Sequence, residues 1–188
     1  MKKFTSLVLI LLLVFSLTAC ISRPRPAQDP APATADQEPA ATDEPADAAD
    51  AKDFACEELR ITLTNDYAEE DSVNGYTGVY ESSDSAVFIL REDKSMLPGV
   101  DMDEYVELVH EANANAGREV GDVHRKDGIP LFEYEFTNPD SNNTFSYYTT
   151  MFESEEAFWL VQFTCFSADY KDMVSRFHTF ARSVTFEE

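Results

Sequence analysis

The sequence predicts an α+β fold in which two main helices pack on a mainly antiparallel sheet of about six to seven strands. Short stretches rich in β-branched and aromatic residues recur from Leu59 onward, and turn residues separate them. Two longer stretches, near 101–116 and 168–181, place apolar side chains at helical spacing. The region 53–188 has the length of one domain and holds nearly all the aromatic residues, so it can bury a core.

The first predicted strands surround a polar loop. Leu59–Leu63 is followed by polar residues through Asn74-Gly75, and the strands Tyr76–Ser82 and Ala86–Glu92 come next. The last of these strands has large apolar side chains on both faces: Val87, Phe88, Ile89 and Leu90. A strand that is buried on both faces is expected at the centre of the sheet.

A helix and a hairpin follow. Asp101 or Asp103 is expected to cap a helix that runs to about Ala116 and stops at Gly117. One side of this helix is apolar and another is acidic, so it is expected to lie on the sheet. The next two strands, Val120–Arg125 and Ile129–Thr137, flank Lys126-Asp127-Gly128, which is typical of a hairpin turn.

The last third of the domain repeats this arrangement. Thr144–Phe152 and Ala157–Phe166 are predicted strands, and the second is again apolar on both faces and therefore central. A helix is expected from about Ala168 to Ala181, and Val184–Phe186 would close the chain as a short strand.

The N-terminus has the order of a lipoprotein signal peptide. Lys2 and Lys3 precede an unbroken apolar run from Leu7 to Phe15, and Leu17-Thr18-Ala19-Cys20 resembles the bacterial lipobox at all four positions. A transmembrane helix, or a secretory signal with a chance cysteine, is the alternative, but a span needs about 20 apolar residues. We therefore expect residues 1–19 to be removed, Cys20 to be lipidated, and the protein to be held on the extracytoplasmic face of the cell membrane.

Residues 20–52 are expected to form a lipidated, disordered tether rich in Pro, Ala and acidic residues. Its thirty-odd residues reach at most roughly 100 Å, and nearer about 30 Å as a flexible coil. A Pro-rich ligand for a recognition module is the alternative. Without Lys2 and Lys3 the chain has 12 basic and 36 acidic residues, a net charge of −24. Such a charge repels phosphate backbones, so no nucleic-acid partner is expected. It also repels anionic lipids, so the acyl chains must bind the protein to the membrane.

Four stretches of the domain look like the PsbP/Mog-like superfamily: Ile61-Thr62-Leu63, Arg91-Glu92, Phe158-Trp159-Leu160-Val161-Gln162-Phe163 and Ala181-Arg182-Ser183-Val184-Thr185-Phe186. The resemblance covers roughly the whole domain and rests on strand patterns. It implies an α/β sandwich with a mainly antiparallel sheet, and it places the chain beside bacterial lipoproteins of the DcrB and LpqN groups. It further implies binding or assembly roles and supplies no catalytic residues to carry over.

Few residue patterns point to chemistry. Glu107-x-x-His110-Glu111 is half of a di-iron carboxylate pattern and fits a solvated helix face better. The stretch 140–142 resembles the opening of a calcium loop, but Gly is missing at its sixth position and position twelve is Met151, so a turn is expected. His124 and His178 have no nucleophile motif beside them, and His178 is expected at the edge of the apolar stripe of the last helix. We therefore expect no catalytic site, metal or cofactor, and no enzyme.

Two cysteines of the domain, Cys56 and Cys165, leave two alternatives open. Outside the cytoplasm they can form a disulfide, and the even number left after lipidation of Cys20 fits this. Equally, both can be unpaired small apolar residues, because Cys165 lies in a predicted central strand.

Three functions fit these observations to different degrees. The first is a lipid-anchored extracytoplasmic binding or assembly module that docks an envelope protein or component. The second is a small-molecule carrier or sensor with an aromatic-lined pocket. The third, a hydrolase or metal enzyme, is disfavoured by the missing motifs.

Overall fold

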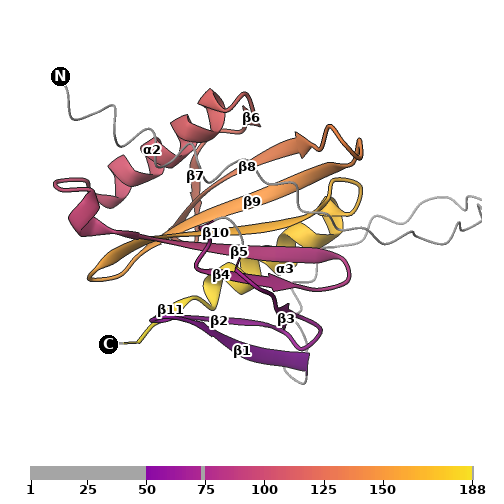
Figure 1. The fold of residues 1–188 in the computed structure, drawn as a ribbon, viewed down its shortest axis with the longest axis horizontal. Helices are drawn as coiled ribbons and strands as arrows, with labels where there is room; N and C mark the ends of the chain where they lie inside the picture. Colours follow the sequence, from indigo (N-terminus) through magenta and orange to yellow (C-terminus); the bar gives the residue numbers. More distant parts are fainter. Residues whose placement is uncertain (1–49, 73–74, 188) are drawn as a thin grey trace, which may run out of the picture.

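The structure is a computed structural model that describes residues 50–72 and 75–187 (Figure 1). The predicted signal peptide, Cys20 and residues 21–49 of the predicted tether lie outside these residues. The described chain has the predicted α+β fold, with two α-helices packed on a mainly antiparallel sheet. No helix in the described part is long and apolar enough to cross a membrane.

The main sheet has β5 (Ser85–Asp93) and β10 (Ala157–Phe166) at its centre. Six of the nine residues of β5 and nine of the ten residues of β10 are buried, which confirms the central positions predicted from their two apolar faces. The strands run antiparallel in the order β3 (Ala68–Glu69), β4 (Gly78–Glu81), β5, β10, β9 (Thr144–Glu153), β8 (Ile129–Thr137) and β6 (Glu119–Val120), while β7 (His124–Lys126) also pairs with β8.

The strand predicted at Val120–Arg125 is instead two shorter strands, β6 and β7. Residues 121–123 between them are exposed and belong to no strand. The Gly121 amide still donates to the Glu133 carbonyl at 2.8 Å. Glycine at such a position is typical of a bend, because it has no side chain to pack on the sheet.

The structure adds a second, three-stranded sheet with the order β1 (Ala51–Cys56), β2 (Leu59–Thr64) and β11 (Thr185–Phe186). The sequence predicted β2 and β11 but neither β1 nor a separate sheet. In Figure 1 this small sheet lies below the main sheet, beside α3 (Tyr170–Arg182).

The start of β1 corrects the predicted domain boundary at Asp53. Lys52 pairs with Leu63 inside the strand, and the Asn65 amide donates to the Asp50 carbonyl at 2.6 Å. The tether expected to run through Lys52 is therefore too long by two residues. Residues 51–53 are exposed and join the sheet through backbone hydrogen bonds, so they carry no apolar pattern from which a strand is predicted.

Both helices follow their predicted signals. α2 (Met102–Asn115) is capped by Asp101, whose carboxylate accepts from the Glu104 amide at 2.9 Å while Glu104 bonds back to the Asp101 amide. The chain leaves α2 through Gly117, which has a φ of 80°. α3 begins at Tyr170, two residues later than predicted.

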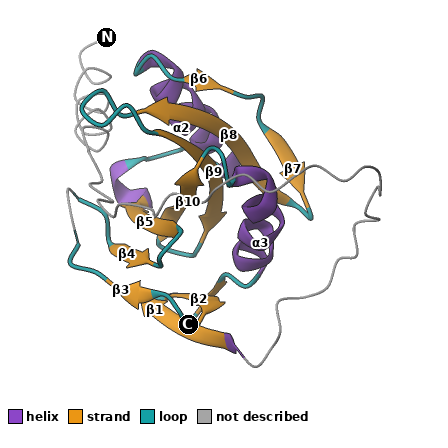
Figure 2. Cartoon of the chain, turned by 90° about the vertical axis from the view of Figure 1, so that its right-hand side faces the viewer, coloured by secondary structure: helices purple, strands orange, loops and turns teal. Residues whose placement is uncertain are grey.

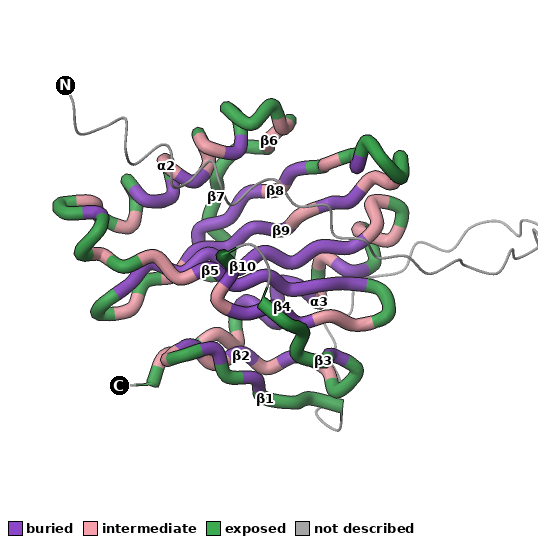
Figure 3. Tube along the Cα trace, viewed as in Figure 1, coloured by how far each residue is buried: buried purple, intermediate pink, exposed green. Residues whose placement is uncertain are grey.

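The two helices cover opposite faces of the main sheet (Figure 2). α3 and the small sheet enclose one core, in which Phe163 stacks on Phe177. α2 covers the other core, in which Tyr105 stacks on Phe158 with 4.5 Å between ring centroids. Figure 3 shows that burial is concentrated in the long strands between these two layers.

Contact between the small and main sheets depends on one glycine. A Cβ at Gly78 in β4 would lie 2.8 Å from the Cys56 Sγ, which is closer than such atoms approach each other. Phe54 and Tyr80 also pack here with ring centroids 4.9 Å apart, and the Tyr80 hydroxyl donates to the Ala55 carbonyl at 3.0 Å. β1 is therefore held on β4 by close packing.

Candidate functional site

The basic side chains of the domain are largely used in internal ion pairs. Residues 50–188 contain 30 acidic and 10 basic residues. Six of the basic side chains pair with carboxylates in the described part: Arg60, Arg91, Lys94, Arg125, Arg176 and Arg182. The carboxylates that remain give the surface of the domain a strong negative charge.

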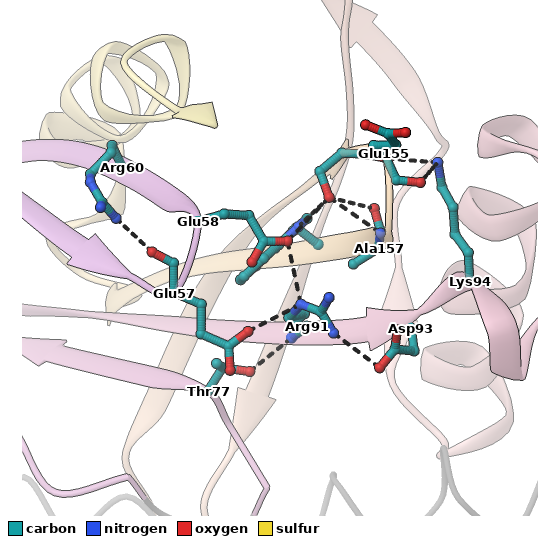
Figure 4. Close-up of polar contacts among 11 residues, drawn as sticks. Glu57, Glu58, Arg60, Thr77, Arg91, Asp93, Lys94, Glu155 and Ala157 are labelled. Atoms are coloured by element: carbon teal, nitrogen blue, oxygen red, sulfur yellow. Dashed lines mark hydrogen bonds and ion pairs between the residues drawn. The ribbon is translucent and has the colours of Figure 1, made fainter. Parts of the chain in front are cut away.

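Arg91, near the end of β5, pairs with three carboxylates (Figure 4). Its Nε lies 3.1 Å from Glu57 Oε2 and 3.4 Å from Glu58 Oε1, and its Nη1 lies 3.1 Å from Asp93 Oδ2. The guanidinium also lies over the Trp159 ring at 5.8 Å. The Arg91 side chain is only 20% exposed, so solvent screens these contacts less than those of a surface ion pair.

Ser154, in the turn between β9 and β10, completes the group that we call the Arg91 junction: Glu57, Glu58, Arg91, Asp93 and Ser154. The Ser154 hydroxyl donates to Glu58 Oε1 at 3.3 Å and accepts from Trp159 Nε1 at 3.2 Å. The junction therefore fastens the turn between β1 and β2 to the main sheet (Figure 4). The chain enters the domain at the other end of this hairpin, at Ala51.

A second polar group joins residues that are distant in the sequence. His178 Nδ1 lies 2.9 Å from the Tyr148 hydroxyl, and His178 Nε2 lies 3.0 Å from Asp127 Oδ2. His178 is buried, at 6% exposure, whereas the sequence placed it at the edge of the apolar stripe of α3. Its two partners come from β9 and from the turn between β7 and β8, and spacing along the chain gave no sign of either contact.

The electrostatics of this group do not favour a nucleophile. Burial raises the pKa of Tyr148, and the carboxylates of Glu133 and Asp127 raise it further. The hydroxyl therefore keeps its proton at neutral pH. With Tyr148 as donor, the hydrogen-bonding pattern assigns Nδ1 of His178 as acceptor and Nε2 as donor to Asp127, whose pKa is lowered mainly by this hydrogen bond.

The two cysteines of the domain are free, buried thiols. The Cys56 Sγ lies against Gly78 in β4. Gly78 is opposite Ile89 of β5, and Ile89 is opposite Val161 of β10. Cys165 lies four residues further along β10 than Val161. Four residues along a strand and two spacings between neighbouring strands put Cys165 roughly 16 Å from Gly78, and therefore far from Cys56. A disulfide needs the two Cα atoms within about 7 Å of each other. The structure does not bring the two cysteines together, so it has two separate thiols where the sequence left a bridge open.

Both thiols are also weak nucleophiles. Burial, and secondarily Glu57, raises the pKa of Cys56 to about 11. Burial, and secondarily Asp169, raises the pKa of Cys165 to about 12. The reactive form of a thiol is the thiolate, so neither side chain is activated at neutral pH.

The other residues of the candidate sequence patterns have local roles. Glu107 and Glu111 are exposed on α2, while His110 Nε2 lies 3.0 Å from the Gly121 carbonyl oxygen. His124 is exposed in β7. The stretch 140–142 belongs to a turn, as expected, in which the Asn138 side chain accepts from the Asp140 amide. Across residues 50–72 and 75–187, no three His, Cys, Asp or Glu side chains are grouped to hold a metal ion.

Comparison with known proteins identifies the fold. No protein-family model matches the sequence, and a search of curated proteins gives no match. The solution structure of cyanobacterial PsbP (CyanoP) from Synechocystis sp. PCC 6803 matches with a TM-score of 0.50 and 11% identity, over 78% of this chain and 98% of that one. A crystal structure from Bacteroides thetaiotaomicron matches with a TM-score of 0.51 and 9% identity, over 74% of this chain and 49% of that one.

The chain therefore has a PsbP-like fold, as the resemblance of its strand patterns implied. LpqN from Mycobacterium tuberculosis, described as involved in cell envelope biogenesis, has a TM-score of 0.44 and 9% identity, over 69% of this chain and 83% of that one. That similarity is too low to carry an argument. At these identities the comparisons establish the fold alone.

The separation of the thiols gives a first prediction. The intact mass of the protein should not change on reduction, and Cys56 and Cys165 should react with iodoacetamide only after unfolding in urea, because burial keeps both protonated and inaccessible. Mass spectrometry of native and unfolded samples measures this. A gain of two mass units on reduction would contradict it.

The Arg91 junction gives a second prediction. Arg91→Gln should lower the free energy of unfolding by about 2 kcal/mol, because it removes charge-assisted hydrogen bonds made by a side chain that is only 20% exposed. Hydrogen exchange should accelerate most in β1 and β2. The matched control is Arg125→Gln, whose ion pair with Asp103 is exposed and should contribute less than about 1 kcal/mol. Equal losses in the two variants would show that the junction has no special role.

Proposed function

We propose that this protein is a lipid-anchored, extracytoplasmic binding module that docks a protein or other component of the cell envelope. The observation that carries the proposal is the division of charge in the domain. Six of its ten cations pair with carboxylates in the described part, its tyrosine and cysteine nucleophiles are buried and protonated, and its surface keeps an excess of carboxylates. Such a surface suits binding through complementary charge more than catalysis, so we further propose that the protein is not an enzyme.

The anchor in this proposal is the acylated Cys20. The lipobox pattern at residues 17–20 supports it, and the described domain begins only at Asp50. The chain between them is long enough to hold the domain away from the lipid surface, which a negative net charge also favours. The PsbP-like domain is then presented to neighbouring envelope proteins at a height set by that segment.

The partner in this proposal presents a basic face. A domain with 30 acidic and 10 basic residues, as in 50–188, repels acidic surfaces and attracts clusters of Lys and Arg. Exposed carboxylates for such contacts include Glu107 and Glu111 on α2 and Glu69 in β3. Interactions of this kind steer encounters between proteins and weaken as salt screens them.

Docking is tested with a carbodiimide, which joins carboxylates to amines that are in direct contact. In intact cells or isolated membranes we expect one dominant product between this domain and lysines of a single partner. Its yield should fall several-fold between about 50 mM and 500 mM salt, because the Debye length shortens from roughly 14 Å to roughly 4 Å. The matched control keeps residues 1–49 but carries an unrelated domain of equal charge. The same product from that control would show that proximity, and not docking, produced it.

The anchor is tested separately. Cys20→Ala should abolish labelling with a palmitate analogue and move the protein from the detergent phase to the aqueous phase, because each buried methylene contributes about 0.8 kcal/mol to membrane partitioning. Cys56→Ala is the matched control, since Cys56 is buried in the domain and should not affect labelling. A native protein that takes no label and washes freely from membranes would refute the anchor.

A further inference from the structure

β1 is a long edge strand for this domain. It contains six residues, whereas the other strands at the edges of the two described sheets, β3, β6, β7 and β11, contain two or three. Short edge strands protect a sheet, because an edge presents unpaired amides and carbonyls to which another chain can bind. The edge formed by β1 lacks this protection, and it lies at the margin of the domain in Figures 1 and 2.

The hydrogen bonds of the first hairpin determine which backbone groups of β1 face outward. The Asn65 amide donates to the Asp50 carbonyl at 2.6 Å, so these two residues form a hydrogen-bonded pair. In an antiparallel ladder such pairs alternate with pairs whose amides and carbonyls point away from each other. When this alternation is continued through the register of β1 and β2, every second residue of β1 points outward: Ala51, Asp53 and Ala55.

Two other contacts agree with this assignment. The Tyr80 hydroxyl donates to the Ala55 carbonyl at 3.0 Å, so this carbonyl is not directed at β2. On the opposite side of the hairpin, the Thr62 amide donates to Ser183 Oγ at 2.9 Å, so it points away from β1. The far edge of β2 is therefore occupied by the chain itself, through Ser183 and β11.

Ala51 and Asp53 keep free backbone groups on the outer side of β1. Across residues 50–72 and 75–187, no group forms a hydrogen bond with the outward amide or carbonyl of either residue. Both residues are exposed, and neither a proline nor a bulge interrupts the six residue pairs of the hairpin. The Lys52 side chain is on the other face of the strand, with its Nζ 4.4 Å from the centre of the Phe54 ring. An incoming strand therefore meets a regular edge with two amides and two carbonyls to bond.

The surroundings of this edge are acidic. Asp53 is in the middle of the outward row, and its carboxylate accepts from the neutral Thr62 hydroxyl at 2.7 Å. Among the described residues no cation pairs with it. The other end of β1 is acidic too, because burial and then three glutamates raise the pKa of Cys56: Glu57, Glu69 and Glu58. A strand that carries Lys or Arg therefore complements the charge of this edge.

The same charge disfavours two other occupants. In a second copy of the chain, two β1 strands paired about a two-fold axis at Asp53 would place the Asp53 carboxylates opposite each other, which destabilises a sheet. The chain's own preceding segment is also unsuitable, since residues 26–49 contain six acidic residues, five prolines and no basic residue. The edge therefore favours an extended basic segment from another protein.

We propose that the free edge of β1 binds an extended, basic segment of a partner protein, which adds a strand to the small sheet. Backbone hydrogen bonds to Ala51 and Asp53 supply the pairing, and a Lys or Arg of the segment lies beside the Asp53 carboxylate. The inference rests on the proposed function for the kind of partner, a basic component of the envelope, and it identifies the strand to which that partner binds.

The test measures amide hydrogen exchange by NMR with the peptide acetyl-Lys-Val-Lys-Val-Lys-Val-amide as probe. The protein is the whole chain without its signal peptide, with Cys20→Ala to keep it in solution. In the free protein the Ala51 and Asp53 amides should exchange quickly and the Lys52 and Phe54 amides slowly, because only the latter bond to β2. With about 5 mM peptide and a Kd of about 1 mM, roughly five-sixths of the protein is bound, so exchange at Ala51 and Asp53 should slow about fivefold. The matched control peptide is N-methylated at every residue, so it keeps the charge but cannot donate, and it should not slow exchange.

Variants of Asp53 test the edge itself. Asp53→Pro removes one outward amide and leaves the hydrogen bonds between β1 and β2 in place, so the peptide should no longer protect Ala51. Asp53→Lys keeps the backbone and reverses the charge, so it should weaken peptide binding several-fold. Its matched control is Glu111→Lys, which makes the same change on the exposed side of α2 and should leave binding unchanged. If Asp53→Pro does not fold, Asp53→Lys and the N-methylated peptide decide the question.

Three results would overturn the proposal. The peptide could leave the Ala51 and Asp53 amides unprotected, or the N-methylated peptide could protect them equally. These amides could also exchange slowly in the free chain, which would show that the preceding segment or a second copy already occupies the edge.

Asp53→Pro also separates this inference from the proposed function. If the carbodiimide product forms in equal yield with this variant, docking stands and strand pairing at β1 is refuted. If the peptide protects the edge but the native protein gives no carbodiimide product, strand pairing stands and the envelope partner is refuted.

Discussion

The antiparallel pairing of β5 with β10 is the constraint on which the rest of the domain depends. Its register runs from Ala157 opposite Asp93 to Cys165 opposite Ser85. Alternate side chains of the two strands enter different cores, so a shift by one residue would exchange the layer under α2 with the layer under α3. The polar groups follow the same register: Arg91 lies beside Trp159 on one face, while Gln162 bonds to Tyr76 and Tyr134 on the other.

Charge is distributed over this frame in two ways. On the α3 side, arginines are placed against carboxylates, and the Arg91 junction uses such contacts to hold the first hairpin on the sheet. On the α2 side, Arg125 pairs with Asp103, while Arg118 donates to the Asn113 side chain and lies over the Tyr134 ring. The first arrangement stabilises the fold and leaves an acidic surface for a partner. The second places a cation against the aromatic layer beneath α2.

Sequence patterns predicted the parts of the fold that depend on side-chain burial. The apolar faces around Val87 and Phe163 identified the central strands, and Asp101 identified the start of α2. β1 was missed because residues 51–53 join the sheet through backbone groups and have exposed side chains. The polar sites were missed for another reason. The partners of His178 lie 30 and 51 residues away along the chain, and Tyr76 lies 86 residues from Gln162, so only the folded register brings them together.

The position of β1 has a mechanical consequence. The chain enters the domain at Ala51, so any pull on the preceding segment acts first on this strand. A force along the strand axis shears all six residue pairs between β1 and β2 at once, whereas a force across the sheet opens them one after another from Ala51. At the far end of the hairpin, the Arg91 junction and the contact between Cys56 and Gly78 resist the second mode. The domain should therefore resist a force along the axis of β1 better than a force across the sheet, because the first loads all six residue pairs together.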